Sequence, residues 1–297
     1  NVVVSYVSTP AASDVVSAVE SIDLCMSMFS IIPDLILAPG FSDQSAVAAA
    51  MAAKATAING KFQAKALVDI DAATYTAAVT AKNNGTFTEA EVVCWPCGSL
   101  GDHIFHGSTL EAGRIASTDA SNQSVPYESP SNKVVYIDGL CLEDGTAVTL
   151  TELQANVLNN AGICTFYNCG GQFIAWGNYT GAWPISSDVT EYFIPVGRMF
   201  DYVRKIIILT FRDKVDDPMN KRLYNTVVDS VNMWLNGLVG AGYLIGARCE
   251  YLDAENPVTA LMSGIITFHV YMTPASPAQD IEFLVEYDVD YMEQAFA

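Results

Sequence analysis

Short apolar runs alternate with helical patterns through the first third of the chain, and this alternation constrains the fold more than any other feature. A short apolar run between turn residues is typical of a buried strand, and an apolar stripe of helical period is typical of a surface helix. The expected strands cover residues 2–7, 35–38, 65–70 and 91–95. The expected helices cover residues 13–29, 42–59 and 71–82. Strands that alternate with helices form a mainly parallel sheet with helices on its faces, so an α/β fold is predicted.

The middle of the chain continues the same mixture and adds a hairpin. The expected elements are a helix at 102–117, a strand at 134–138, a helix at 151–160 and strands at 163–167 and 172–176. Thr149 and Thr151 each begin a capping-box pattern at the start of the third of these elements. The two Gly of Asn168-Cys-Gly-Gly171 indicate a turn between the last two strands.

A second unit is predicted from Pro195 onward. Two long helices are expected, one from Arg198 to before Pro218 and one from Lys221 to Gly240. Strands are expected at 244–252, 264–272 and 281–291. The predicted organisation is therefore an α/β domain over 1–194 and an α+β domain of two helices and about three strands over 195–297. The chain begins at Asn1 without a Met, and we expect that residues preceding it have been removed or omitted.

The last expected strand has the strict two-residue period of a half-buried strand. Apolar and acidic side chains alternate along it, and the apolar ones are Ile281, Phe283, Val285, Tyr287 and Val289. A long alternating strand at a chain end either closes its own sheet or is added to the sheet of a neighbouring molecule. Both possibilities are open on the residues alone.

The charge of the chain argues against a nucleic-acid partner. It carries 14 Lys and Arg against 33 Asp and Glu, a net charge of −19. Half of the basic residues nevertheless lie between 198 and 222, namely Arg198, Arg204, Lys205, Arg212, Lys214, Lys221 and Arg222. Such a segment indicates either contact with an acidic partner or a surface of local ion pairs.

Three of these basic residues, Arg198, Lys205 and Arg212, recur every seven positions and would form one stripe on a helix. Pairing of Asp201 with Lys205 would explain little of the stripe, because an exposed pair contributes only about 0.3–0.5 kcal/mol. We therefore expect that replacing Arg198 and Arg212 by Glu weakens binding of an acidic partner without lowering stability.

Composition excludes several other classes. No apolar run approaches the roughly 20 residues of a membrane helix, and no signal peptide is recognisable. Seven Cys, an odd number, do not predict a disulfide framework.

The best chemical candidate is Cys94-Trp-Pro-Cys97, which is expected between a strand and a helix, where a helix N-terminus lowers a thiol pKa. Buried, inert thiols are the competing interpretation. His103 and His106 could share a metal with Asp102 or Glu111 on a helix. Cys164 and Cys169 could join the first two Cys in a zinc site. None of the common nucleotide-binding, metalloprotease or serine-hydrolase motifs is present, so no enzyme activity and no cofactor are predicted.

Together these segments resemble the contractile tail sheath proteins of bacteriophages and R-type bacteriocins, in particular those of Mu-like prophages. The resemblance covers about 29 to 297. Its motifs lie at 35–41 (LILAPGF), 66–70 (ALVDI), 126–133 (PYESPSNK), 155–159 (ANVLN), 175–178 (AWGN), 216–220 (DDPMN), 234–237 (WLNG) and 255–257 (ENP). Tyr179 stands where the family has Arg, so no role of that Arg is carried over.

The resemblance implies a mechanical function rather than catalysis. Sheath subunits form hexameric rings stacked in a helical lattice around a tail tube protein, between baseplate and tail terminator proteins, and contract to drive the tube through a cell envelope. It implies a virion tail assembled in the host cytoplasm, with no nucleic acid and no membrane insertion. Ile281 to Tyr291 is the implied donated strand, with Ile281, Phe283, Val285, Tyr287 and Val289 as the candidate donated residues. The C-terminal unit is the implied inner domain, and its candidates for contact with an acidic tube are Arg198, Lys205, Arg212, Lys221 and Arg222. The alternative is a thiol-redox or zinc-binding α/β protein that uses Cys94 and Cys97.

Overall fold

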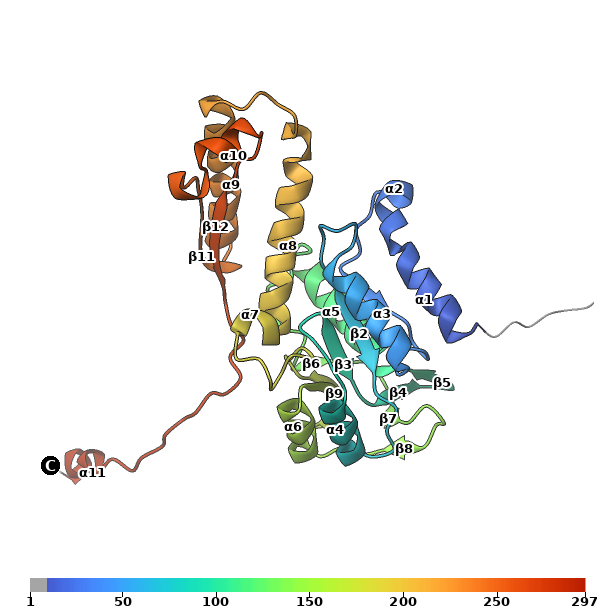
Figure 1. Cartoon of the computed structure of the whole chain (residues 1–297). Helices are drawn as coiled ribbons and strands as arrows, with labels where there is room; N and C mark the ends of the chain where they lie inside the picture. The colour runs from blue at the N-terminus through green and yellow to red at the C-terminus, as the bar shows by residue number, and fades with distance from the viewer. Residues whose placement is uncertain (1–9, 297) are drawn as a thin grey trace, which may run out of the picture.

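A mixed, mostly parallel sheet forms the centre of the computed structural model, which describes residues 10–296 (Figure 1). The strand order is β1-β2-β3-β9-β10-β6. The strands are β1 (Leu35–Leu37), β2 (Lys65–Asp69), β3 (Glu91–Cys94), β9 (Ile163–Cys169), β10 (Gln172–Trp176) and β6 (Lys133–Val134). The first four are parallel, and β10 and β6 each run antiparallel to the neighbour before them in the sheet. The predicted α/β class is therefore confirmed, with an antiparallel edge.

Helices cover both faces of this sheet because successive residues of its central strands point to opposite sides. Ala66 and Val68 of β2 pack in one apolar cluster with residues of α3, α4 and α6. Leu67 packs in a second cluster with residues of α5 and with Ile194 at the start of α8. The covering helices are α3 (Ser45–Thr56), α4 (Tyr75–Asn84), α5 (Gly107–Ser121) and α6 (Glu152–Asn160). Thr151 and Gln154 form the predicted capping box of α6.

Several expected helices have different bounds from those predicted. The helix expected over 42–59 is shorter, and its N-cap is Gln44 instead of Ser42. The helix expected over 13–29 is divided into α1 (Ala12–Glu20), a 3-10 turn η1 (Ser21–Leu24) and α2 (Cys25–Phe29). Thr74, not Asp71, caps α4. The strand expected at 2–7 lies outside the described residues.

The helix expected from Asp102 begins only at Gly107. A second, antiparallel sheet precedes it, with the order β5-β4-β7-β8. Its strands are β4 (Cys97–Leu100), β5 (His103–Phe105), β7 (Gly139–Cys141) and β8 (Ala147–Val148). Gly101 has a φ of +56° and its amide donates to Asp138 Oδ2 at 2.7 Å, so the chain turns there and residues 103–105 pair with β4.

The C-terminal part is a long helix pair beside a two-stranded sheet (Figure 1). Its elements are α7 (Val189–Tyr192), α8 (Ile194–Thr210), the 3-10 turn η2 (Arg212–Lys214), α9 (Lys221–Gly240), β11 (Leu244–Glu250), the 3-10 turn η3 (Asp253–Glu255), α10 (Val258–Met262) and β12 (His269–Pro274). Met199 and Val203 of α8 meet Val231 and Leu235 of α9 and Leu244 of β11 in its apolar core. α9 and β11 lie close to their predicted positions. α8 begins and ends earlier than predicted, and β12 begins five residues later than the strand expected at 264–272.

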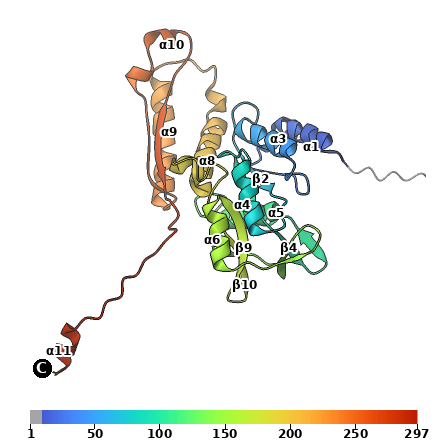
Figure 2. The ribbon, with the colours of Figure 1, turned by 60° about the horizontal axis from the view of Figure 1, so that its bottom comes forward.

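The third strand predicted for this unit, 281–291, is not formed. Residues 275–289 have no regular structure, and α11 (Asp290–Phe296) follows them. In both views the segment leaves the body, and α11 lies far from it (Figures 1 and 2). A strand needs hydrogen-bonding partners on a neighbouring strand, and the segment does not fold back onto a sheet of its own chain. No helix among residues 10–296 is long and apolar enough to cross a membrane.

Candidate assembly interface

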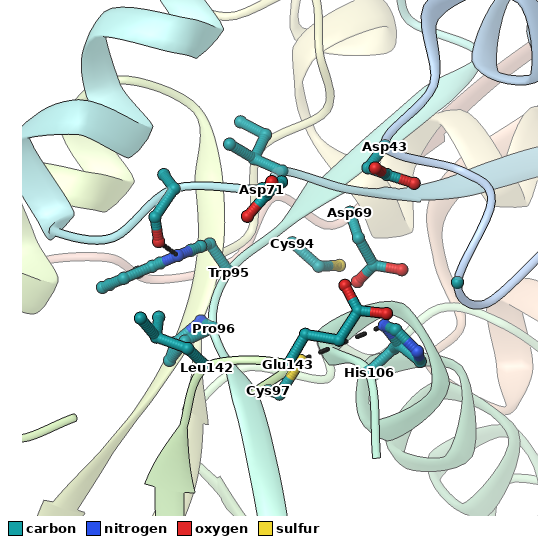
Figure 3. Close-up of a pocket in the computed structure, with 13 residues that line it drawn as sticks. Asp43, Asp69, Asp71, Cys94, Trp95, Pro96, Cys97, His106, Leu142 and Glu143 are labelled. Carbon is teal, nitrogen blue, oxygen red and sulfur yellow. Dashed lines mark hydrogen bonds between the residues drawn. The ribbon is translucent and has the colours of Figure 1, made fainter. Parts of the chain in front are cut away.

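The two cysteines of the Cys-Trp-Pro-Cys motif lie beside a small pocket at the carboxyl ends of β2 and β3 (Figure 3). Cys94 is the last residue of β3 and is fully buried, and Cys97 begins β4. The pocket has a volume of about 30 Å³, which is enough for about one water molecule. The motif therefore does not lead directly into a helix, contrary to the prediction. The Gly107 amide at the start of α5 does hydrogen-bond to Cys97 and lowers its pKa, but burial outweighs this effect.

Both thiols are held in the unreactive form. Burial raises the pKa of Cys94 well above its ordinary value. Burial, and then the nearby carboxylate of Asp69, raise the pKa of Cys97 to about 12. Because the thiolate is the nucleophile and the metal ligand, a thiol with such a pKa is poorly suited to redox exchange at neutral pH. The structure thus gives no support to the redox alternative.

The metal-site predictions also fail on geometry. His103 lies on β5 and His106 is the N-cap of α5, so the two side chains do not share a helix face. Cys169 is exposed near the hairpin turn, whereas Cys164 is buried beside Cys94. Within the described part of the chain, no group of three His, Cys, Asp or Glu residues could hold a metal ion.

Asp69, the carboxylate in this pocket, has a structural role. It accepts hydrogen bonds from the Ser108 amide at 2.7 Å, the Ser108 hydroxyl at 2.5 Å and the Ser42 hydroxyl at 2.9 Å. These bonds satisfy an amide in the first turn of α5 and join that helix to the end of β2. The pocket is explained by packing.

The predicted basic stripe does not form one exposed surface. Arg198 is only 6% exposed, and its guanidinium donates to both carboxylate oxygens of Asp119, at 3.0 and 2.5 Å. Lys205 forms an ion pair with Asp34. Arg212 lies beyond the end of α8, in η2. The first two of these residues therefore attach α8 to the α/β part of the chain instead of facing a partner.

Three basic residues are exposed where α8 connects to α9. Arg212 lies in η2, and Lys221 and Arg222 form the first turn of α9, whose N-cap is Asn220. Within residues 10–296 none of the three forms an ion pair, whereas Lys214 between them pairs with Asp213 and Asp217. This connection lies at the end of the helix pair farthest from the central sheet (Figure 1). We call Arg212, Lys221 and Arg222 the basic tip.

The most exposed apolar segment is the one expected to be a donated strand. We call residues 281–289 the C-terminal arm. Its predicted residues are exposed, with Ile281 at 69%, Phe283 at 85%, Val285 at 92%, Tyr287 at 76% and Val289 at 61%. Sequence reasoning found this segment through its alternating period.

The residues just before the arm line a groove of about 990 Å³ with the loops that carry several of the sequence motifs. The groove lies between residues 127–133, the side of α6, residues 176–179 and residues 275–281. The hydroxyl of Tyr179 donates to Gln279 Oε1 across it, at 2.6 Å. Sequence reasoning missed this contact, because two residues 100 positions apart share no local pattern.

The fold is that of contractile sheath proteins. A cryo-EM structure of the anti-feeding prophage helical sheath in the contracted state superposes with a TM-score of 0.72 at 21% identity, over 94% of this chain and 76% of that one. The contracted sheath complex of the extracellular contractile injection system PVC superposes with a TM-score of 0.73 at 19% identity, over 92% of this chain and 75% of that one.

Curated relatives define the family more closely. The prophage major tail sheath protein of Pseudomonas aeruginosa strain UCBPP-PA14 is 31% identical over 277 residues, 88% of this chain and 66% of that protein. The tail sheath protein of Burkholderia phage BcepMu is 23% identical over 304 residues, 95% of this chain and 62% of that protein. No model of a known protein family matches the chain. The chain belongs to the contractile tail sheath proteins, and it spans somewhat less than two thirds of the length of these two relatives.

Proposed function

We propose that this chain is a non-enzymatic subunit of a contractile tail sheath, which polymerises around a tail tube and contracts to drive the tube through a cell envelope. The observation that carries the proposal is the C-terminal arm, an unpaired segment whose alternating apolar side chains are 61–92% exposed. Burial of one such side chain contributes roughly 1.5–3 kcal/mol, so an arm of five is strongly favoured to pair with another molecule.

The β11–β12 sheet is the acceptor that the structure favours. Among residues 10–296 it has two strands, so within this part of the chain each strand has one unpaired edge. A two-stranded sheet is marginal by itself, and added strands extend both its hydrogen bonds and its apolar face. Ile245 of β11 is 69% exposed and offers an apolar contact there. Addition of the arm of one subunit to this sheet in another would connect copies of the chain.

The basic tip is the proposed contact with the tube. Its three side chains are exposed on an otherwise acidic chain, and opposite charges favour association with an acidic surface. The proposal assigns residues 195–297 to an inner domain that faces the tube and residues 1–194 to an outer domain. Arg198 and Lys205 are no longer candidates, because they are paired within the chain.

The proposed partners are other copies of the chain in stacked hexameric rings, a tail tube protein, and baseplate and tail terminator proteins. The particle would be a virion tail assembled in the host cytoplasm. Similarity to sheath and baseplate structures of the anti-feeding prophage supports self-association and contact with a baseplate.

Deletion of residues 281–297 tests the central claim. The shortened chain should keep most of its circular dichroism spectrum, because of the regular elements it loses only α11, and none of the described residues that are deleted belongs to the apolar core clusters. It should lose the rings or tubes that the longer chain forms with its tube protein, measured by sedimentation and electron microscopy.

A matched pair of variants tests whether polymer formation needs the apolar face of the arm or only the presence of the segment. Phe283→Asp with Val285→Asp should abolish polymers, whereas Glu282→Gln with Glu286→Gln, on the alternate positions, should not. Normal polymers from the deleted chain would show that the arm is not the connecting element.

A further inference from the structure

The C-terminal arm does not leave the body where the last strand ends. β12 ends at Pro274, and residues 275–281 then follow the groove described above. Pro274 is buried and Pro277 is half-buried, whereas every residue from Ala278 to Met292 is exposed. The chain therefore stays close to the body for several residues before the arm becomes free.

Tyr179 is the only described residue whose side chain hydrogen-bonds to this segment from across the groove, through the 2.6 Å bond to Gln279 Oε1. Its ring is fixed in place. It stacks on Trp183 with a centroid distance of 4.4 Å and an interplanar angle of 8°, and it is also stacked on Phe193 at 5.7 Å. A hydroxyl on such a restrained ring loses little side-chain freedom when it forms a hydrogen bond.

A fixed point at Gln279 shortens the reach of the arm. Ten residues separate Gln279 from Val289, so the arm extends at most about 35 Å from that point. Without the fixed point the free chain would begin at Pro274, and the limit would be about 50 Å. A shorter and directed tether raises the effective concentration of the arm at acceptor sites within reach and excludes more distant ones.

We propose that Tyr179 is a positioning residue that anchors the root of the C-terminal arm at Gln279, and so sets the direction and reach with which the arm finds its acceptor. This inference rests on the proposed function for its consequence, but the anchor itself is a property of the single chain.

The anchor is tested by backbone ¹⁵N order parameters of the deuterated monomeric chain. In the unchanged protein, order should persist through Gln279 and fall within the arm. In Tyr179→Phe, which keeps the stacked ring and removes only the hydroxyl, the fall should move back toward Ala275, with values below about 0.6 from there onward. Tyr192→Phe is the matched control, because Tyr192 belongs to the same aromatic cluster and, among the described residues, its hydroxyl makes no hydrogen bond to residues 275–281.

Exchange of the partner residue provides the second half of the test. Gln279→Leu should reproduce the effect of Tyr179→Phe, and the two changes together should add nothing further. Gln279→Glu should keep the order, because a carboxylate is also a hydrogen-bond acceptor. Because Gln279 is exposed, its variants fold even if a change at Tyr179 does not.

Polymer formation then tests whether the anchor affects assembly. Loss of the anchor should raise the protein concentration needed for polymer formation about two- to tenfold, the range expected from one lost hydrogen bond. Unchanged order parameters in Tyr179→Phe and Gln279→Leu would overturn the anchor, whatever the polymers do. Absence of polymers from the unchanged chain with its tube protein would overturn the proposed function, while the order parameters would still decide the anchor.

Discussion

Glu111 on α5 is a buried carboxyl group whose ionised form is disfavoured by the fold around it. It is 1% exposed, and neither carboxylate oxygen has a hydrogen-bond partner among the described residues. Burial raises its pKa to about 8, and the nearby Arg114 only partly opposes this shift. Glu111 is therefore protonated in the folded chain at neutral pH, whereas in the unfolded chain it is ionised.

The stability of the protein should therefore depend on pH through Glu111. Because the pKa of Glu111 is raised in the folded chain, its favourable contribution to the free energy of unfolding is complete below about pH 4.5. This contribution is lost as the pH rises through about 8. Glu111→Gln, which cannot ionise, should match the unchanged protein near pH 4 and be more stable by a few kcal/mol at pH 8. Urea unfolding at a series of pH values measures this difference. Parallel pH profiles for the two proteins would contradict the assignment.

At the scale of the element, the two long helices divide the basic residues between two tasks. Those on α8 are paired with the α/β part of the chain, and those of the basic tip are exposed. Sequence periodicity predicted α8 and α9 correctly, because their apolar stripes are local patterns. It could not separate the two groups of basic residues, because the acids that pair with Arg198 and Lys205 lie at Asp119 and Asp34, far away in sequence.

The basic tip should affect tube binding without affecting stability. Lys221→Glu with Arg222→Glu should weaken co-sedimentation with purified tail tube by roughly tenfold at low salt, and less at high salt, because exposed charges are screened. The melting temperature should stay within a few degrees of its original value. For net charge, the single change Lys221→Glu is compared with Lys61→Glu, which makes the same charge change at another exposed position. Equal tube binding by the unchanged protein and by the variant with both Lys221→Glu and Arg222→Glu would place the tube contact elsewhere.

The C-terminal arm is an element that local pattern predicted but that the single chain does not form. Its alternating pattern predicted a strand over 281–291, yet the single chain has no strand there. The pattern determines which face of a strand would be apolar, but the strand itself forms only when a second strand supplies hydrogen bonds. The helix expected at 102–117 failed for a related reason, since the turn at Gly101 allows residues 103–105 to pair with β4 instead.

For the whole molecule, ion pairs along α8 connect the C-terminal elements to the central sheet. Arg198 meets Asp119 at the end of α5, and Lys65 of β2 meets Asp201 at 3.3 Å. These pairs are partly buried, so removing one partner leaves a charge with poor solvation. In a contracting sheath such connections would let force applied to one part of the subunit reach the other.

Loss of this connection should be costly. Arg198→Ala should lower the free energy of unfolding by about 3 kcal/mol, because Asp119 is left unpaired in a partly buried position. This expectation replaces the sequence-based one, in which a change at Arg198 leaves stability unaltered. Arg212→Ala should change it by less than about 0.5 kcal/mol. Thermal and urea unfolding measure both values, and a similar small loss for the two variants would argue against the connection.

The sequence by itself determined the local structure of this protein: the buried parallel strands, the two long helices, the hairpin at Asn168–Gly171 and the amphipathic period of the arm. It also carried enough of the family motifs to indicate a sheath subunit. Only the tertiary structure decided that Arg198 and Lys205 face inward, that the Cys94 and Cys97 thiols are inert, and that Tyr179 meets Gln279. Periodicity and capping act over a few residues, whereas charge pairing, burial and hydrogen bonds across a groove depend on which distant segments packing brings together.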